Sequence, residues 1–195
     1  KRRDYLHCPV CEMVFVPDRY LLDSVAEKMQ YDLHRNSADD AGYCHFLGRL
    51  LHALLPKLTS GMSGLEFGCG PEPVLANLLI QQGFSMSLFD PYYFQDTTAL
   101  QKQYDFITCT EVIEHVYDAR NVWEQFFGLL KPGGWLGIMT KRVLSESAFS
   151  RWHYKNDPTH VRFYSEQTFY WIAHQWQATL LLTASDVALI QKPTA

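Results

Sequence analysis

Two carboxylates and an imidazole lie close together near the middle of the chain, directly after an apolar stretch. In a helix over residues 111–116, Glu111, Glu114 and His115 would fall within about 100° of one face. One interpretation makes His115, with Glu111 beside it, a general base that takes a proton from a substrate. A second makes all three side chains ligands of a divalent ion, together with a further histidine. The alternative, in which these residues have no catalytic or metal-binding role, is an acidic first turn favoured by the helix dipole, with His115 a hydrogen-bonded polar residue.

His160 is the candidate for that further histidine, and His153 is the reserve. Two carboxylates and two imidazoles suit Mg, Mn, Fe or Zn, and the ligand types do not decide among these metals. The ion would lower the pKa of a bound hydroxyl group and orient it. Alternatively, residues 157–160 close a pocket, and His160 is hydrogen-bonded to a carboxylate of the pair.

A glycine-containing loop is the second group of residues that could do chemistry. Gly68 and Gly70 let the backbone turn sharply and approach a ligand, and Asp90, twenty residues beyond Gly70, could accept hydrogen bonds from ribose hydroxyls. Glu66 would repel a pyrophosphate and favour a cation, and Pro73 replaces the third glycine of the dinucleotide pattern. S-adenosylmethionine, which has an ammonium, a sulfonium and no phosphate, therefore fits better than NAD. The alternative is a tight strand–helix turn without a ligand.

The elements that must position these residues alternate between short apolar strands and helices. We expect strands at 63–67, 84–89, 104–109 and 134–140, and helices at 73–82, 118–130 and 165–175. This alternation predicts right-handed crossovers and a mostly parallel sheet. Residues 176–191 are expected to form two more strands, split at 183–186, and without a helix between them these strands must be antiparallel. The predicted fold class is α/β: a doubly wound, mostly parallel sheet with a terminal antiparallel hairpin.

Two further regions precede this core, which is expected over residues 59–195. Residues 21–58 are predicted to form N-terminal helices at 23–34, where apolar residues recur every four positions, and at 40–55. Residues 1–20 carry a Cys pair and a short strand at 13–16. Because the chain begins with Lys1, we expect it to be cut from a longer one.

The spacing of Cys8 and Cys11 is that of a zinc knuckle, but a single pair supplies only two of the four ligands that a structural zinc needs. Within this chain two ordinary thiols are therefore the favoured interpretation. A truncated zinc ribbon is the alternative.

Four motifs, taken in order, resemble those of the class I S-adenosylmethionine-dependent methyltransferases. They are residues 65–70, Asp90, residues 105–115 and residues 130–136, and the resemblance covers roughly residues 61–193. It implies a Rossmann-like fold with S-adenosylmethionine as the cofactor. Two departures stand out: Glu72 replaces a further glycine of many relatives, and only 15 residues separate Asp90 from Asp105. The strand–helix unit between these two aspartates is therefore expected to be shortened or missing.

The same resemblance implies roles for individual residues. The methionine end of the cofactor would lie against Glu66 and the loop Gly68-Cys69-Gly70, the ribose against Asp90, the adenine beside Pro91 or Tyr92, and the sulfonium near Thr110. The set Glu111, Glu114, His115 and the later His160 resembles the metal site of small-RNA 2′-O-methyltransferases and of quinone-pathway O-methyltransferases.

Composition limits the partners and the location of the protein. The formal net charge is −4, which disfavours nucleic acid as a partner without excluding a local basic patch. No apolar run approaches the roughly 18 residues of a membrane span, so no membrane partner is expected. The odd count of five cysteines argues against a disulfide scaffold and favours a reducing, cytoplasmic compartment.

The leading hypothesis is transfer of a methyl group from S-adenosylmethionine to an oxygen or nitrogen of an unidentified acceptor, either a small molecule or a macromolecule. Aromatic residues within 141–164 would cover the acceptor pocket, and Tyr31, His34 and Tyr43 would form its opposite wall. Two other hypotheses remain open. One is an NAD(P)-dependent Rossmann oxidoreductase, and the other is a non-catalytic nucleic-acid adaptor with a zinc ribbon.

Overall fold

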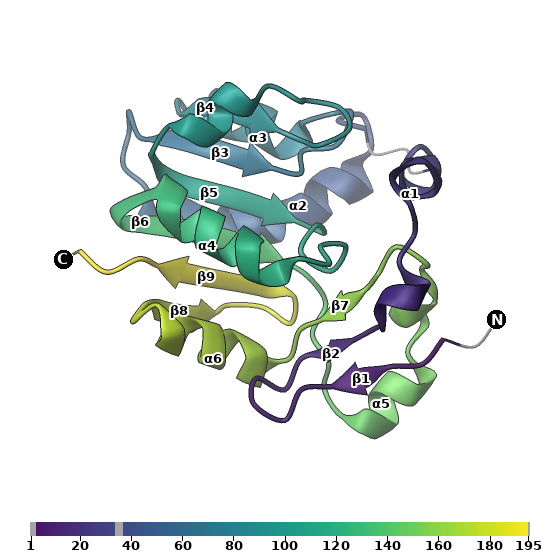
Figure 1. Cartoon of the computed structure of the whole chain (residues 1–195). Helices are drawn as coiled ribbons and strands as arrows, with labels where there is room; N and C mark the ends of the chain where they lie inside the picture. Colours follow the sequence, from purple (N-terminus) through teal and green to yellow (C-terminus); the bar gives the residue numbers. More distant parts are fainter. Residues whose placement is uncertain (1–2, 34–36, 195) are drawn as a thin grey trace.

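A six-stranded sheet in the order β4-β3-β5-β6-β9-β8 forms the centre of the molecule (Figure 1). The computed structural model describes residues 3–33 and 37–194 of the chain. The four strands β3 to β6 are parallel, and β9 is antiparallel to both of its neighbours. The strands are β3 (Ser63–Phe67), β4 (Ser85–Phe89), β5 (Tyr104–Thr110), β6 (Leu130–Met139), β8 (Thr179–Leu182) and β9 (Val187–Gln191). The predicted parallel sheet with a terminal hairpin is confirmed, with β9 inserted between β6 and β8.

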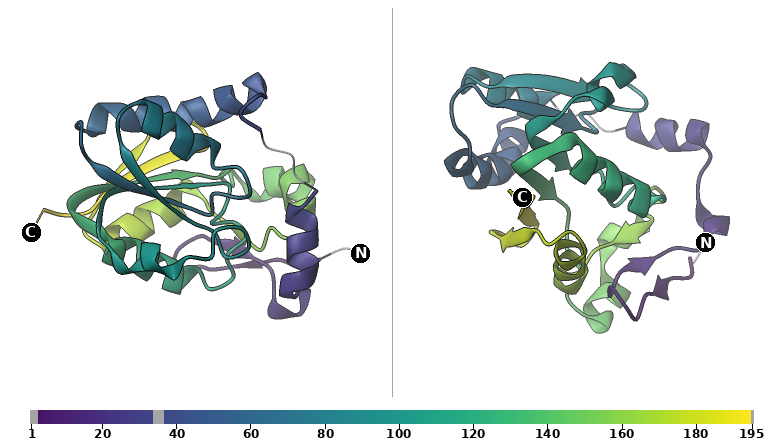
Figure 2. Two further views of the ribbon diagram at one scale, coloured as in Figure 1. Left: turned by 90° about the horizontal axis from the view of Figure 1, so that it is seen from above. Right: turned by 60° about the vertical axis from the view of Figure 1, so that its left-hand side comes forward.

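Helices cover both faces of this sheet (Figures 1 and 2). One face is covered by α2 (Ala41–Leu54) and α3 (Val74–Gln81), and the other by α4 (Ala119–Leu129) and α6 (Glu166–Gln175). Side chains alternate along each strand: Val187 and Leu189 of β9 pack in the cluster of α2 and α3, whereas Ala188 and Ile190 pack in the cluster of α4 and α6. Burial of both faces explains why these strands are nearly continuous apolar runs in the sequence.

The unit between β4 and β5 is shortened, as the spacing of Asp90 and Asp105 predicts. A bridge between Asp90 and Phe94 and the 3₁₀ helix η3 (Thr97–Gln101) are its only regular elements among the described residues. In the part of the chain that the structure describes, no strand lies outside β4, so β4 forms the edge of the sheet. The loop after β4 is therefore free to extend over the carboxyl ends of the parallel strands.

Helix α1 (Ser24–Tyr31) lies beyond those carboxyl ends and buries none of its residues (Figure 1). Asp23 caps it by accepting a hydrogen bond from the amide of Ala26. The apolar residues that predict this helix face solvent: Val25 and Met29 of α1 are 70% and 64% exposed, and Leu33, beyond the end of the helix, is 72% exposed. The opposite side of α1 faces the site described below.

A small antiparallel sheet, β1-β2-β7, lies at the same end of the molecule. It joins β1 (Leu6–His7) and β2 (Val14–Phe15) to β7 (Arg162–Phe163), and it packs on a cluster that includes Val16, Phe149 and Phe163. The sequence predicts one strand at 13–16 and misses its two partners. The chain from β6 to β7 forms α5 (Glu146–Arg151) and the 3₁₀ helix η4 (His153–Asn156), and 3₁₀ turns η1 (Asp18–Tyr20) and η2 (Leu55–Lys57) follow β2 and α2.

Within the described ranges, no helix has both the length and the apolar character that crossing a membrane requires.

Candidate active site

A cavity of about 790 Å³ opens at the carboxyl ends of β3, β4 and β5. Ligands of open α/β sheets bind at this edge because the loops after parallel strands meet there. All eight residues predicted to contact a cofactor line the cavity: Glu66, Gly68, Cys69, Gly70, Asp90, Pro91, Tyr92 and Thr110. Glu111, His115 and His160 line it as well, so both groups of predicted residues face one space.

The two loop glycines are required for different reasons. Gly68 has a φ of +74°, and a Cβ on it would lie 2.4 Å from a methyl group of Val112. Gly70 has a φ of +64° but has no atom within 4 Å of the position of a Cβ. A side chain at either position would be strained, and at Gly68 it would also displace the segment that follows β5.

Glu66 is a buried carboxylate at the base of the cavity. It is 3% exposed, and its Oε2 accepts a hydrogen bond of 2.8 Å from the amide of Ala76 in the first turn of α3. Burial raises its pKa to about 8. A cation bound next to Glu66 would favour the ionised form, which agrees with the cationic ligand that the sequence predicts.

Asp90 is fixed by three backbone amides. Its Oδ2 accepts a hydrogen bond from Gly70 (2.9 Å), and its Oδ1 accepts from Tyr92 (2.8 Å) and Tyr93 (3.1 Å). A carboxylate has about four acceptor positions, so one remains for a ligand hydroxyl. Asp90 thus joins the glycine loop to the loop after β4 and sets the width of the cavity between them.

Helix α1 covers the cavity through contacts that the sequence does not reveal. The Tyr92 hydroxyl donates a hydrogen bond to Glu27, and the Tyr93 hydroxyl donates one to Asp32 over 2.7 Å. The Tyr31 ring lies edge-on to His115, with centroids 5.2 Å apart. Tyr31 and Tyr43 both line the cavity, as predicted, and His34 lies outside the described residues.

The segment 111–116, considered above as a helix, is not helical. Glu111 has a φ of +52°, and the segment continues as a turn in which the amides of His115 and Val116 bond to the carbonyls three residues earlier. Tertiary contacts replace the helical bonds, because the carbonyl of Glu114 accepts hydrogen bonds from the amides of Val161 (2.8 Å) and Arg162 (3.0 Å). The turn still brings the side chains of Glu114 and His115 together.

Tyr154 brings the two carboxylates together. Its hydroxyl donates a hydrogen bond to Glu114 and lies 3.3 Å from Oε2 of Glu111. Burial raises the pKa of both carboxyl groups, so a proton shared within this cluster is favoured at neutral pH. Tyr154 lies forty positions beyond Glu114, and nothing in the local sequence pattern indicates this contact.

Three of the four predicted metal ligands form a compact group. Ligand atoms of Glu114, His115 and His160 all lie within 4.8 Å of one another, whereas Glu111 is outside this group. His160 has its Nδ1 2.7 Å from the carbonyl oxygen of Tyr154, a contact that leaves Nε2 as the ligand nitrogen when Nδ1 carries the proton. Oε2 of Glu114 is buried without a hydrogen-bond partner among the described residues. This donor set fits a divalent cation. The reserve ligand His153 is exposed and is not part of the group.

The cysteines divide into two kinds. Cys69 and Cys109 are buried, and burial raises the pKa of both thiols, which makes them poor nucleophiles. Cys8 and Cys11 are half-buried free thiols in the turn between β1 and β2. Over residues 3–33 and 37–194, no third histidine, cysteine or carboxylate groups with that pair.

Comparison with known proteins agrees with this geometry. A family model described as a methyltransferase domain matches residues 32–182, which is more than half of the chain. The chain therefore belongs to the class I S-adenosylmethionine-dependent methyltransferase family.

Curated relatives match over part of their length. Ubiquinone biosynthesis O-methyltransferase of Erwinia tasmaniensis is 29% identical over 100 residues, which cover 51% of this chain and 41% of the relative. The protein of the same name from Colwellia psychrerythraea is 30% identical over 99 residues, which cover 48% of this chain and 38% of the relative. The chain thus spans about two fifths of the length of these relatives.

Solved structures share the fold at low sequence identity. The 1,6-didemethyltoxoflavin-N1-methyltransferase of Burkholderia thailandensis, solved with 1,6-didemethyltoxoflavin and S-adenosylhomocysteine, has a TM-score of 0.60 at 13% identity. The match covers 96% of this chain and 98% of that protein. An O-methyltransferase family protein from the same organism has a TM-score of 0.54 at 14% identity and covers 91% of this chain and 62% of its own.

Proposed function

We propose that this protein transfers a methyl group from S-adenosylmethionine to a hydroxyl oxygen of an acceptor. One observation carries the proposal: the glycine loop with its buried carboxylate and the imidazole of His115 line the same cavity. Donor and acceptor bound in one cavity can be held collinear, which supplies much of the rate of an in-line displacement.

The donor side of the cavity consists of residues in or after β3, residues after β4, and the last residue of β5. Glu66 faces the cationic methionine end, the loop Gly68-Cys69-Gly70 keeps its backbone open to the ligand, and Asp90 accepts from the ribose. Pro91 and Tyr92 flank the adenine, and Thr110 lies on the sulfonium side. S-adenosylmethionine supplies a methyl group on a positively charged sulfur, and these residues bind and orient it.

The acceptor side consists of residues that follow β5, together with α1. His115 takes the proton from the acceptor hydroxyl, and Glu111, which lines the same cavity, stabilises the positive charge on the imidazole when its own carboxyl group is ionised. The ring of Tyr31, edge-on to His115, excludes water from the space next to the imidazole, and Tyr43 of α2 lines the same cavity. An imidazole beside carboxylates suits a hydroxyl, because an oxygen acceptor must lose its proton to become a good nucleophile, whereas a neutral amine already is one. The curated relatives named above are also O-methyltransferases.

As an alternative for this side we propose a divalent cation, which would replace His115 as the group that activates the acceptor hydroxyl. Glu114, His115 and His160 would hold it, and the observation that favours it is their convergence within 4.8 Å around a carboxylate oxygen that has no hydrogen-bond partner within the described part of the chain. The cation would lower the pKa of the acceptor hydroxyl. Elemental analysis of protein purified without chelator tests this: we expect metal in the wild type and a loss in His160→Ala, and equal content in both would remove His160 from the site.

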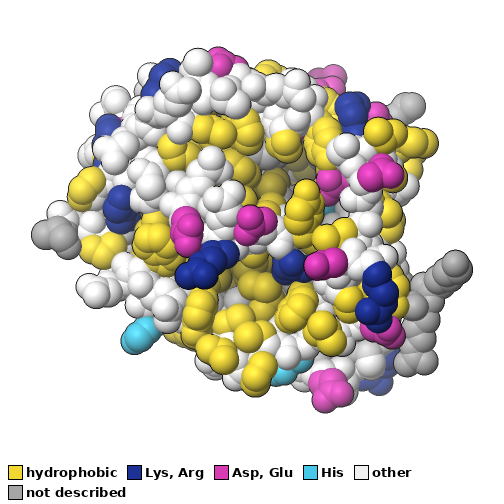
Figure 3. Space-filling model, in the orientation of Figure 1, with side chains coloured by type: hydrophobic (Ala, Val, Ile, Leu, Met, Phe, Trp, Pro, Cys, Tyr) yellow, Lys and Arg dark blue, Asp and Glu magenta, His cyan; other side chains and the backbone are white. Residues whose placement is uncertain are grey.

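Two alternatives predict different ligands. An NAD(P)-dependent oxidoreductase would be stabilised by NAD, and a nucleic-acid adaptor would bind RNA or DNA with a steep salt dependence. Acidic side chains stand among the basic ones on the face seen in Figure 3, and the net charge of −4 does not favour the adaptor.

A thermal-shift comparison separates these functions. We expect S-adenosylhomocysteine to raise the melting temperature and NAD to leave it unchanged, and a shift with NAD alone would contradict the proposal. His115→Ala should abolish transfer and leave the affinity for S-adenosylhomocysteine nearly intact. Asp90→Ala should weaken cofactor binding first, so an unchanged affinity in this variant would show that the assignment of the donor side is wrong.

A further inference from the structure

The guanidinium group of Arg3 lies against the loop that carries His160. Nη1 of Arg3 donates hydrogen bonds to the carbonyl oxygens of Pro158 and His160, both at 3.1 Å. Nη2 donates to the carbonyl of Asp157 at 2.6 Å and to that of Lys155. One side chain near the start of the described chain thus satisfies four carbonyls in a loop more than 150 positions away.

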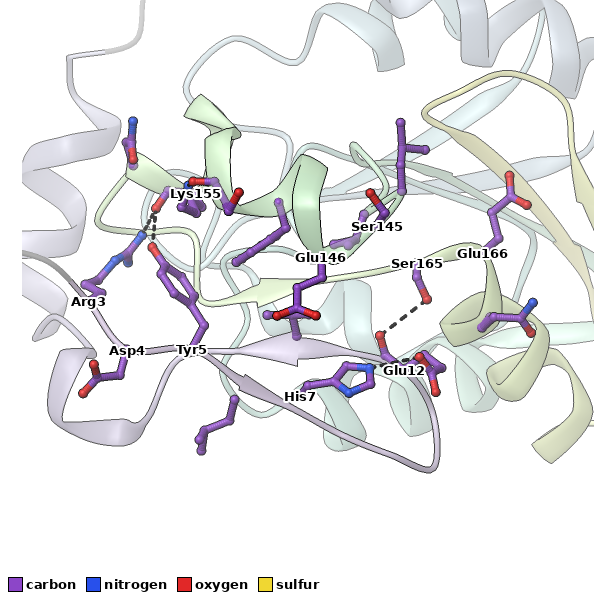
Figure 4. A pocket seen from close by; sticks show the side chains of 18 residues that line it. Arg3, Asp4, Tyr5, His7, Glu12, Ser145, Glu146, Lys155, Ser165 and Glu166 are labelled. Carbon is purple, nitrogen blue, oxygen red and sulfur yellow. Dashed lines mark hydrogen bonds and ion pairs between the residues drawn. The ribbon is translucent and has the colours of Figure 1, made fainter.

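Tyr5, next to the small sheet, holds Arg3 in this position. Tyr5 precedes β1, its hydroxyl donates to the same carbonyl of Lys155 at 3.0 Å, and the Arg3 guanidinium lies 5.7 Å from the centre of its ring (Figure 4). The Tyr5 ring in turn packs edge-on against Phe149 and Phe163, with centroids 5.0 and 5.9 Å away. The arginine is therefore oriented by a packed aromatic cluster.

The loop needs such a support because its own structure is sparse. Between η4 and β7 the segment 157–161 has no regular secondary structure. Its internal bonds are a turn closed by the Asp157 carboxylate, a 3.3 Å bond from the His160 amide to the carbonyl of Asp157, and a 3.9 Å contact between Nε2 of His160 and Oδ2 of Asp157. Four carbonyl oxygens that converge on one point repel one another, and a planar cation with five donors offsets this repulsion. Lysine, which concentrates its charge at one atom, cannot reach the four oxygens in the same way.

The opposite side of the same loop faces the candidate active site. The imidazole of His160 lies 4.7 Å from that of His115, centroid to centroid, and its Nδ1 contacts the carbonyl of Tyr154. Because the carbonyl of His160 is bound by Arg3, the backbone position of this residue depends directly on the arginine.

We propose that Arg3 is a positioning residue for the active site: it holds residues 155–160 so that the His160 imidazole faces Glu114 and His115. The proposal rests on the proposed function for its catalytic meaning. The N-terminal segment is then part of the architecture of the active site. From the sequence, residues 1–20 are expected only to form a separate segment with a Cys pair. Arg3 does not line the cavity of the candidate active site and acts only through the loop.

The test is the imidazole N–H proton of His160, observed by NMR in the whole chain at fixed pH. In the wild type the contact with the Tyr154 carbonyl should protect this proton and give a downfield resonance, which His160→Asn removes and so assigns. Arg3→Ala should abolish the resonance or broaden it beyond detection, and Arg3→Lys should restore it only weakly. Methylguanidinium added to Arg3→Ala should bring it back.

The matched control is Arg19→Ala, which removes an exposed arginine of the same N-terminal segment that pairs with Asp4. It should leave the resonance unchanged. An unaltered resonance in Arg3→Ala, or its absence from the wild type, would overturn the proposal. If Arg3→Ala does not fold, Tyr5→Phe serves in its place, because it removes one bond to the Lys155 carbonyl and should weaken the protection.

The NMR result for His160 does not depend on the proposed function. Calorimetry of S-adenosylhomocysteine on the wild type tests the cofactor, and its failure would leave the NMR result standing. If the wild type binds S-adenosylhomocysteine, Arg3→Ala should keep the same affinity for it and lose turnover. General unfolding would lower both.

Discussion

We expect Glu66 to make cofactor binding dependent on pH. Its pKa of about 8 in the free protein means that at pH 6 only about one molecule in a hundred carries the ionised carboxylate. If the cationic end of the ligand requires that carboxylate, the apparent affinity falls with the ionised fraction, by about 50-fold from pH 8 to pH 6. Binding should also release a proton to the buffer.

Calorimetry of S-adenosylhomocysteine from pH 6 to pH 8 measures both effects, when repeated in buffers of different ionisation enthalpy. Glu66→Gln should bind with nearly the same weak affinity across the range and release no proton from this site. Glu72→Gln, which changes an exposed carboxylate of the same loop, is the control and should behave as the wild type. A pH dependence that persists undiminished in Glu66→Gln would refute the reasoning.

The same shift has a consequence for the stability of the free protein. Since the folded-state pKa of Glu66 lies above the unfolded value of 4.5, its contribution is fully present below pH 4.5 and is lost as pH rises to about 8. The total loss is about 5 kcal/mol at 1.36 kcal/mol per unit. In urea unfolding, the free energy of unfolding of Glu66→Gln should therefore rise relative to that of the wild type between pH 5 and pH 8. A constant difference between the two proteins over this range would contradict this.

Three further predictions concern the loop and the carboxylate cluster. Gly68→Ala should lower the free energy of unfolding by about 2 kcal/mol or more, because a strained φ adds to a clash with Val112, whereas Gly70→Ala should cost about 1 kcal/mol for the strain alone. Equal losses in denaturant unfolding would be inconsistent with that contact. Asp90→Asn should weaken binding of S-adenosylhomocysteine at least tenfold by calorimetry. Both carboxylate oxygens of Asp90 accept hydrogen bonds from backbone amides, whereas an asparagine side chain has only one oxygen that can accept them. Tyr154→Phe should destabilise the protein by about 1–3 kcal/mol at neutral pH, because it leaves buried carboxylates without their donor; an unchanged unfolding midpoint would argue against the cluster.

Much of the fold follows from periodicity in the sequence. The strand predicted at 63–67 is β3, and the helices predicted at 73–82, 118–130 and 165–175 agree with α3, α4 and α6 to within a residue or so at each end. These elements are buried on one or both faces, so burial leaves a clear apolar pattern. The residues predicted to contact the cofactor could be assigned to one cavity for a related reason, since the loops after parallel strands must meet at one edge.

The contacts that complete the site could not be predicted, because they join segments far apart in the chain. Tyr154 reaches Glu114 across forty positions, and the bonds from Val161 and Arg162 to the Glu114 carbonyl hold a turn where local pattern favours a helix. The apolar stripe of α1 predicts the helix but not its orientation, since polar contacts of Tyr92 and Tyr93 turn the opposite side toward the cavity.

A crystal of this protein soaked with S-adenosylhomocysteine tests the central claim most directly. We expect the ligand to occupy the cavity with its ammonium at Glu66, its ribose at Asp90 and its sulfur facing His115. An empty cavity, or one that takes up a dinucleotide with its diphosphate on the glycine loop, would contradict it.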